Sequence, residues 1–205
     1  MRDNAFCELS RERDRSLIRT GRWIALIVML WRGASAVAEP AVLADFSDSG
    51  EIAAWQPLHD SVMGGRSEGE LRAGADGAAV FTGTISLANR GGFASVRGPV
   101  RAYPLQDCRG VVVEARGDAR AFQLRLRIDD RYDGIAYRAF FEPSPDRWRT
   151  FILPFETFVP VFRGRVLGAP GELDPRRITR IGLMLADKVA GPYRLEIRRI
   201  LGDCG

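Results

Sequence analysis

The chain is poor in the side chains on which most catalytic and metal centres depend. Its 205 residues include one histidine, His59, and one lysine, Lys188, and no two cysteines have the spacing of a zinc site. His59, Asp60 and Ser61 contain the residue types of a hydrolase triad, but consecutive residues do not normally turn their side chains into a linear relay. We therefore predict a protein that is not an enzyme and that holds no metal and no cofactor.

Two groups of acidic residues leave narrower alternatives open. An enzyme would need a pair of perturbed carboxyl groups, for which Glu114 and Glu196 are candidates, but spacing alone does not bring them together. The turn with Asp129, Asp130 and Asp133 offers oxygen ligands suited to calcium. Aspartate is also common in turns for conformational reasons, and we expect that simpler explanation to hold.

The chain also lacks amphipathic segments of helical period after its first forty residues. It has short apolar or alternating segments instead, separated by Gly, Pro, Asp and Asn. Residues 122–128 alternate apolar and polar side chains, as in a half-buried antiparallel strand. Further strands are expected at residues 80–84, 92–96, 111–116, 135–141, 149–153, 178–185 and 193–200. About nine or ten strands at this spacing predict an all-β fold, a single jelly-roll β-sandwich covering residues 39–205.

Residues 1–38 have the pattern of a secretory signal peptide. Several arginines precede an apolar run at residues 23–31, and Ala36-Val37-Ala38 follows it. The run is about half the length of a membrane-spanning helix, so cleavage after Ala38 is favoured over a retained anchor. We therefore expect an exported protein, periplasmic or secreted, with no transmembrane segment in the mature chain.

The cysteines are consistent with export. Cys7 would be lost with the signal peptide, which leaves Cys108 and Cys204 as an even number in an oxidising compartment. If residues 110–116 and 193–201 pair as antiparallel strands, these two cysteines come close together. A disulfide is the favoured prediction, and two free buried thiols are the alternative.

The balance of charge argues against nucleic-acid binding. The N-terminal 38 residues hold a surplus of arginine, so the rest of the chain is close to neutral and lacks the basic excess that nucleic acids require. Three alternating strands nevertheless carry polar residues on one side. These residues form either a solvated ladder of opposite charges or a concave arginine-rich face for acidic envelope glycans. They are Glu114, Arg116, Arg125, Arg127, Glu196 and Arg198.

The most distinctive motif is a glycine-rich loop. Trp55 is followed by His59-Asp60-Ser61-Val62-Met63-Gly64-Gly65-Arg66-Ser67, and then by Asn89-Arg90-Gly91-Gly92-Phe93-Ala94-Ser95. In this order and spacing the chain resembles the complex I intermediate-associated protein family over roughly residues 43–201. His59 departs from the family pattern, which usually has asparagine at that position.

The resemblance implies a galactose-binding-like sandwich and a role as an assembly factor or chaperone that binds a protein client, with respiratory-complex subunits as candidate partners. The binding residues are expected in loops at one end of the sandwich. The alternatives are a purely structural loop and, as a second function, a carbohydrate-binding module. The candidate residues are His59, Asp60, Met63, Gly64, Gly65, Ser67, Asn89, Arg90, Asp187 and Lys188.

Overall fold

The computed structural model describes residues 41–131, 133–168 and 171–205, and the predicted signal peptide lies outside them. These residues form one compact unit that is built mainly of strands. The strands are β1 (Val42–Asp45), β2 (Gln56–Pro57), β3 (Glu68–Ala73), β4 (Ala79–Ile85), β5 (Ala94–Arg97), β6 (Gly110–Gly117), β7 (Phe122–Arg127), β8 (Ala136–Phe141), β9 (Arg149–Pro154), β10 (Val159–Phe162), β11 (Arg165–Val166), β12 (Arg180–Leu185) and β13 (Gly191–Asp203). The helical segments are short: α1 (Ser49–Ala53) and four 3-10 turns, η1 (Asp60–Met63), η2 (Ala88–Arg90), η3 (Phe155–Thr157) and η4 (Pro175–Arg177).

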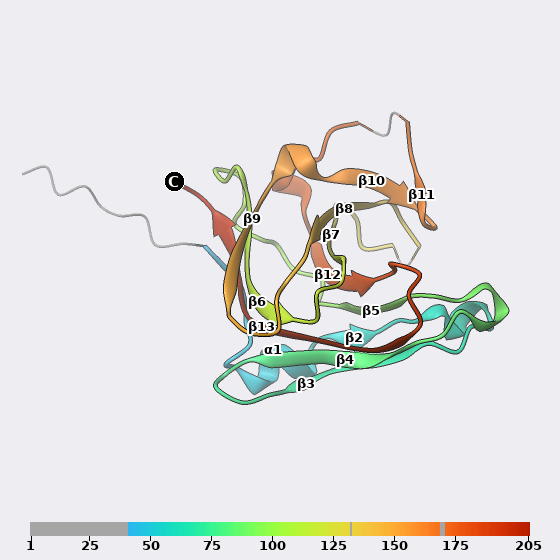
Figure 1. The fold of residues 1–205 in the computed structure, drawn as a ribbon. Helices are drawn as coiled ribbons and strands as arrows, with labels where there is room; N and C mark the ends of the chain where they lie inside the picture. Colours follow the sequence, from blue (N-terminus) through green and yellow to red (C-terminus); the bar gives the residue numbers. More distant parts are fainter. Residues whose placement is uncertain (1–40, 132, 169–170) are drawn as a thin grey trace, which may run out of the picture. The chain divides into compact units, whose positions relative to one another are not determined.

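The strands form two antiparallel sheets. The six-stranded sheet has the order β3-β4-β13-β6-β9, with β1 beside β13, and the seven-stranded sheet has the order β11-β10-β8-β7-β12-β5-β2. Figure 1 shows β13, near the red end of the colour scale, beside the green strands β4 and β6. This arrangement confirms the predicted all-β sandwich.

The core lies between the two sheets, as the alternating patterns predict. On β7 the side chains of Leu124 and Leu126 are fully buried, and on β13 those of Leu195 and Ile197 are fully buried too. Fully burying a Leu or Ile side chain contributes about 1.5–3 kcal/mol. The polar side chains of β7 consequently lie on the other face of the seven-stranded sheet.

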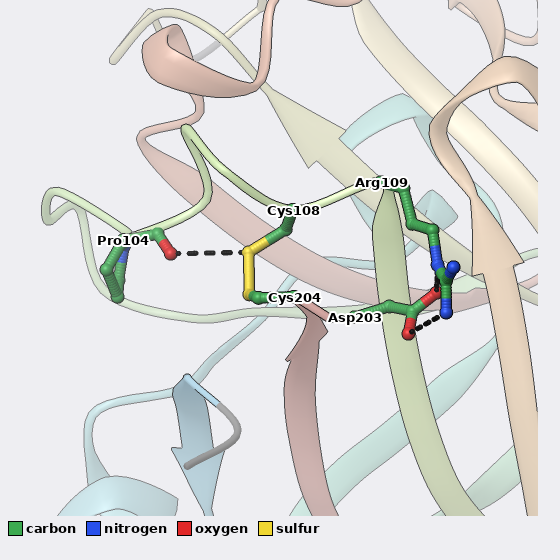
Figure 2. The surroundings of a disulfide bond; sticks show 5 residues. All are labelled: Pro104, Cys108, Arg109, Asp203 and Cys204. Carbon is green, nitrogen blue, oxygen red and sulfur yellow. Dashed lines mark hydrogen bonds and ion pairs between the residues drawn. A yellow bond between two sulfur atoms is a disulfide. The ribbon is translucent and has the colours of Figure 1, made fainter. Parts of the chain in front are cut away.

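The disulfide prediction is confirmed. Cys108 and Cys204 are bonded across a sequence separation of 96 residues, and Figure 2 shows the bridge beside the Arg109–Asp203 ion pair. The two cysteines meet because β6 and β13 pair antiparallel, with Gly110 opposite Asp203. Within the described residues, no helix has the length and apolar character required to cross a membrane.

Candidate functional site

Asp60 is the buried centre of the glycine-rich loop. Its side chain has no exposed surface. One carboxylate oxygen accepts a hydrogen bond from the Ser67 amide at 2.8 Å, and the other accepts from the Ser67 hydroxyl at 2.6 Å and the Gly92 and Phe93 amides at 2.6 and 3.2 Å. Burial raises the pKa of Asp60, but these hydrogen bonds lower it more, so it lies below the ordinary value. Asp60 and Ser67 therefore hold two loops together.

The two glycines of the loop have separate roles. Gly64 ends η1 with a φ of 86°, in the left-handed region that disfavours other residues. Gly65 allows a close approach, because a Cβ atom there would lie 2.3 Å from the Asp60 carboxyl carbon. The motif thus requires a positive φ at its first glycine and close packing on Asp60 at its second.

His59 bridges neighbouring strands. Its Nδ1 atom accepts a hydrogen bond from the Ser95 amide at 3.4 Å, and its Nε2 atom lies 2.7 Å from the Gly69 carbonyl oxygen. Since an amide only donates, Nδ1 is the acceptor and Nε2 carries the proton that is donated to Gly69. Both ring nitrogens are engaged within the fold, so His59 has a structural role in this conformation.

Three loops are joined into one surface that we call the rim, comprising residues 60–65, 87–92 and 186–190. The Asn89 side-chain amide donates to the Gly64 carbonyl at 2.9 Å, and the Lys188 ammonium donates to the Gly91 carbonyl at 3.0 Å. The rim exposes the apolar side chains of Val62, Met63, Leu87 and Val189. Met63 is 66% exposed, so it does not fill the core.

Three rim residues other than glycine have left-handed backbone conformations. Asn89, Arg90 and Lys188 have φ values of 55°, 62° and 64°. Such conformations cost about 1–3 kcal/mol each and are concentrated at binding sites in proteins. All three belong to the set of candidate residues, and the strain is concentrated where a binding site was predicted.

Asp187 anchors the turn between β12 and β13. Its carboxylate accepts two hydrogen bonds from Arg120, at 2.7 and 2.8 Å, and both side chains are 12% exposed. Burial raises the pKa of Asp187, but the bonds from Arg120 and the Val189 amide lower it more. Asp187 is therefore occupied within the fold, whereas the neighbouring Lys188 lines an open groove.

The groove lies on the outer face of the seven-stranded sheet and has a volume of about 630 Å³. Its lining brings the rim and the sheet together, since Met63 from η1 and Lys188 from the β12–β13 turn lie beside side chains of β5, β7 and β8. Its basic residues include Arg90, Arg97, Arg125, Arg127, Arg138 and Lys188. The structure therefore joins three rim candidates, Met63, Arg90 and Lys188, with two residues of the predicted concave face.

That predicted face does not exist as one surface. Arg125 and Arg127 lie on β7 in the seven-stranded sheet, whereas the other four residues lie on β6 and β13 in the six-stranded sheet. Alternation shows which residues share one side of a strand, but it does not show which strands share a sheet. The four separated residues are Glu114, Arg116, Glu196 and Arg198.

The four residues on the six-stranded sheet form a ladder of opposite charges. Arg116 pairs with Glu196 at 2.8 Å and Arg198 with Glu114 at 3.6 Å, and both guanidinium groups lie over the ring of Trp148. Burial raises the pKa of Glu196, but Arg116 and Arg194 lower it more. A general acid needs a raised pKa, so this geometry gives no support to the acid-pair enzyme.

The acidic turn also has internal partners. Asp129 pairs with Arg131 at 2.8 Å and Asp133 with Arg163 at 2.5 Å. Within residues 41–131, 133–168 and 171–205, no group of three or more His, Cys, Asp or Glu side chains is placed to hold a metal ion. The calcium alternative therefore has no geometric support.

Comparison with known proteins first defines the structural class. The family 11 carbohydrate-binding module of the cellulosomal cellulase Lic26A-Cel5E of Clostridium thermocellum has a similar fold, with a TM-score of 0.57 and 17% sequence identity. The similarity covers 80% of this chain and 94% of that module. At this level of identity the likeness concerns the fold alone, and it supports the predicted galactose-binding-like sandwich.

The family follows from the sequence match. Residues 44–197 match the family Complex I intermediate-associated protein 30 (CIA30), and the chain belongs to this family. It is 26% identical over 181 residues to the mitochondrial complex I intermediate-associated protein 30 of Drosophila melanogaster, and 27% identical over 177 residues to that of Mus musculus. These alignments cover 78% and 76% of this chain but only 61% and 54% of the two relatives.

The relatives also correct the predicted location. Both are named mitochondrial, so the prediction of an exported, periplasmic or secreted protein is wrong. Its basis was an arginine-rich segment before a short apolar run, and arginine-rich N-terminal segments also occur in mitochondrial transit peptides. Charge and apolar length therefore do not distinguish the two destinations here.

Proposed function

We propose that this protein is a non-catalytic client-binding module with a role in respiratory complex I assembly, and that it holds its client through the rim. The observation that carries the proposal is the exposure of Val62 and Met63, at 60% and 66%, on a loop fixed by the buried Asp60 carboxylate. Exposed apolar side chains on an ordered loop are typical of surfaces that bind proteins.

The rigidity of the rim favours binding. Asn89 and Lys188 tie the three loops together, so a client would find the apolar side chains already arranged. Ordering a mobile side chain at an interface costs about 0.5–1.5 kcal/mol, and a pre-arranged loop avoids part of that cost. Burying one large apolar side chain contributes about 1.5–3 kcal/mol, so Val62 and Met63 together could supply much of a moderate affinity.

The chemistry of the predicted site supports a binding role over a catalytic one. His59, Asp60 and Asp187 are all hydrogen-bonded to partners within the fold. The lowered pKa values of Asp60 and Asp187 also disfavour proton donation at neutral pH. The remaining rim residues offer contact surface and positive charge.

Affinity purification from extracts of the protein's own organism tests the proposal. A variant with Val62→Ala and Met63→Ala should lose complex I subunits that co-purify with the wild-type protein. The matched control, Ile152→Ala with Val166→Ala, removes side chains of 59% and 57% exposure away from the rim. Equal recovery of complex I subunits with both variants, or no enrichment of such subunits by the wild type, would show that the rim does not hold this client.

A carbohydrate-binding module for acidic glycans is the second candidate function. The observation that favours it is the arginine-rich groove on the outer face of the seven-stranded sheet. Guanidinium groups suit the carboxylates of acidic sugars. Titration with oligogalacturonate separates the candidates, because a glycan-binding module would bind it through the groove even when Val62 and Met63 are replaced.

A further inference from the structure

The outer face of the six-stranded sheet carries an apolar stripe that crosses four neighbouring strands. Along this part of the sheet β9, β6 and β13 follow one another, and β1 lies beside β13 (Figure 1). In their register Ile152 lies opposite Val112, which lies opposite Leu201, and Leu201 lies opposite Val42. Residues directly opposite each other in antiparallel strands share one face of the sheet. We call these four residues the stripe: Val42, Val112, Ile152 and Leu201.

The stripe faces solvent and not the core. Ile152 and Val42 are 59% and 56% exposed, and Val112 and Leu201 are half-buried. The chain neighbours on either side of Val112 and Leu201 are buried, because successive side chains of a strand point to opposite faces of the sheet. A solvated sheet face normally carries polar side chains. Single exposed apolar residues are ordinary, but a continuous apolar row is typical of an interaction surface.

A row of alternating charge lies next to the stripe. Two positions from the stripe along β6 and β13, Glu114 lies opposite Arg199, which in turn lies opposite Asp45 of β1. Arg199 and Glu114 form an ion pair at 3.0 Å, and their side chains are 49% and 21% exposed. Across the three strands the charges therefore alternate from negative to positive to negative.

These two rows are complementary to themselves. A second copy can pack face to face about a two-fold axis that runs parallel to the strands, midway between β6 and β13, and this places each of these strands over the other strand of its partner. Val112 then faces Leu201 of the second copy, and Glu114 faces Arg199 of the second copy. Each contact occurs twice. Packed sheets keep their strand directions within about 30° of each other, so these central pairs lie closest to register.

We propose that the stripe is a homodimer interface, on which two copies pack their six-stranded sheets face to face with each Glu114 opposite Arg199 of the other copy. The proposal does not depend on the client-binding function. Leu201 and the rim turn at residues 186–190 belong to opposite ends of β13, about 30 Å apart along the strand. The groove lies on the outer face of the other sheet. A dimer of this kind leaves the rim and the groove of each copy free.

Sedimentation velocity of the full chain from about 1 µM to about 500 µM tests the proposal. Four strands at about 4.8 Å give a contact about 19 Å across, which is small for a stable dimer, so the wild type should dimerise in the micromolar range. Ile152→Asp should raise the Kd of the dimer at least about 100-fold, because each dimer would bury two carboxylates without partners.

Val166→Asp is the matched control. Val166 is a β-branched residue of similar exposure, 57%, on β11 of the seven-stranded sheet, and its replacement should leave the Kd unchanged. Circular dichroism shows that both variants are folded. A wild type that stays monomeric at about 500 µM, or a Kd that Ile152→Asp does not raise above that of Val166→Asp, would overturn the proposal.

A mixing experiment tests the symmetry of the dimer. In Glu114→Arg alone two positive charges face each other at both central pairs, and in Arg199→Glu alone two negative charges do so, so each variant should dimerise at least about tenfold more weakly than the wild type. In an equimolar mixture opposite charges face each other again, and heterodimers should form with nearly the wild-type Kd. A mixture as weak as the separate variants would overturn the proposed arrangement.

Client capture separates this inference from the proposed function. The rim variant Val62→Ala with Met63→Ala should dimerise as the wild type does, and Ile152→Asp should still capture complex I subunits through its rim. If the rim variant captures these subunits unchanged while Ile152→Asp abolishes the dimer, the client proposal fails and the dimer stands. If the wild type is a monomer and Ile152→Asp loses the subunits, the stripe is a client surface and the dimer proposal fails.

Discussion

Replacing Asp60 tests whether one buried carboxylate holds the glycine-rich loop. Asp60→Ala leaves the amides of Ser67, Gly92 and Phe93 without their acceptor in a site where the carboxylate has no exposed surface. A buried donor left without a partner costs about 1–3 kcal/mol, and partial relaxation of the loop brings the sum to about 3–6 kcal/mol. That sum is a large share of the roughly 5–15 kcal/mol stability of a typical domain.

Urea denaturation followed by circular dichroism measures this loss. The unfolding midpoint should fall strongly, and the melting temperature by roughly 10–15 °C for a domain of this size. Asp60→Asn should lose less stability than Asp60→Ala, because asparagine has the same shape and keeps one acceptor oxygen. It still loses some stability, since its NH₂ group faces one of the groups that donate to the carboxylate in the wild type. Asp107→Ala removes an exposed aspartate and is the control. A loss below about 0.5 kcal/mol for Asp60→Ala would refute the claim that this carboxylate anchors the loop.

Acid adds an independent test of the same residue. The folded pKa of Asp60 is below its unfolded value, so its contribution is fully present above the unfolded pKa and is lost as pH falls through the folded value. Stability of the wild type should therefore decline below about pH 4, with a smaller decline in Asp60→Asn. An identical pH dependence for the two proteins would contradict the assignment.

Three further outcomes are expected. Arg90→Gly should leave the free energy of unfolding unchanged or raise it by up to about 1 kcal/mol in a thermal melt, because glycine tolerates the left-handed backbone at this position. The same variant should capture less client. A clear loss of stability would contradict the claim that Arg90 is strained. The double variant Cys108→Ser, Cys204→Ser should lower the free energy of unfolding by about 4–5 kcal/mol, the value that the chain-entropy model gives for a disulfide across a 96-residue separation. An unchanged midpoint in a urea titration would contradict this prediction. Asp187→Asn should cost about 1–3 kcal/mol by breaking the two-point contact with Arg120, which a double-mutant cycle with Arg120→Gln can isolate.

Much of the fold could be predicted because its signals are local. Period-two alternation on β7 and β13 follows directly from burial on one face, and the β7–β8 hairpin follows from the acidic turn between them. The proximity of Cys108 and Cys204 also followed from the assumption that β6 and β13 pair antiparallel. The prediction missed five strands. Four of them, β1, β2, β10 and β11, have only two to four residues, and β3 has no fully buried residue.

The candidate site was harder to predict because its members differ in role. The motif placed Asp60, Met63 and Arg90 in one loop region; in the structure Asp60 and Met63 share η1, and Met63 and Arg90 line one groove. It did not show that Asp60 is an internal anchor while Met63 and Arg90 are exposed. Burial of a polar residue depends on partners distant in sequence, here Gly92 and Phe93, which donate across 32 and 33 positions.

The groove was only half visible in the sequence because it depends on sheet order. Arg125 was recognised from the alternation on β7, but Arg97 and Arg138 were missed, since nothing local places β5, β12, β7 and β8 side by side. Gly182 is the most informative residue in retrospect. A glycine in the middle of an apolar strand signals a close approach, and here a Cβ atom would lie 3.0 Å from the Val96 carbonyl oxygen of the neighbouring strand β5. The apolar rim residues Val62 and Met63 line the same groove as these arginines, and the groove could not be assigned until the strands were ordered.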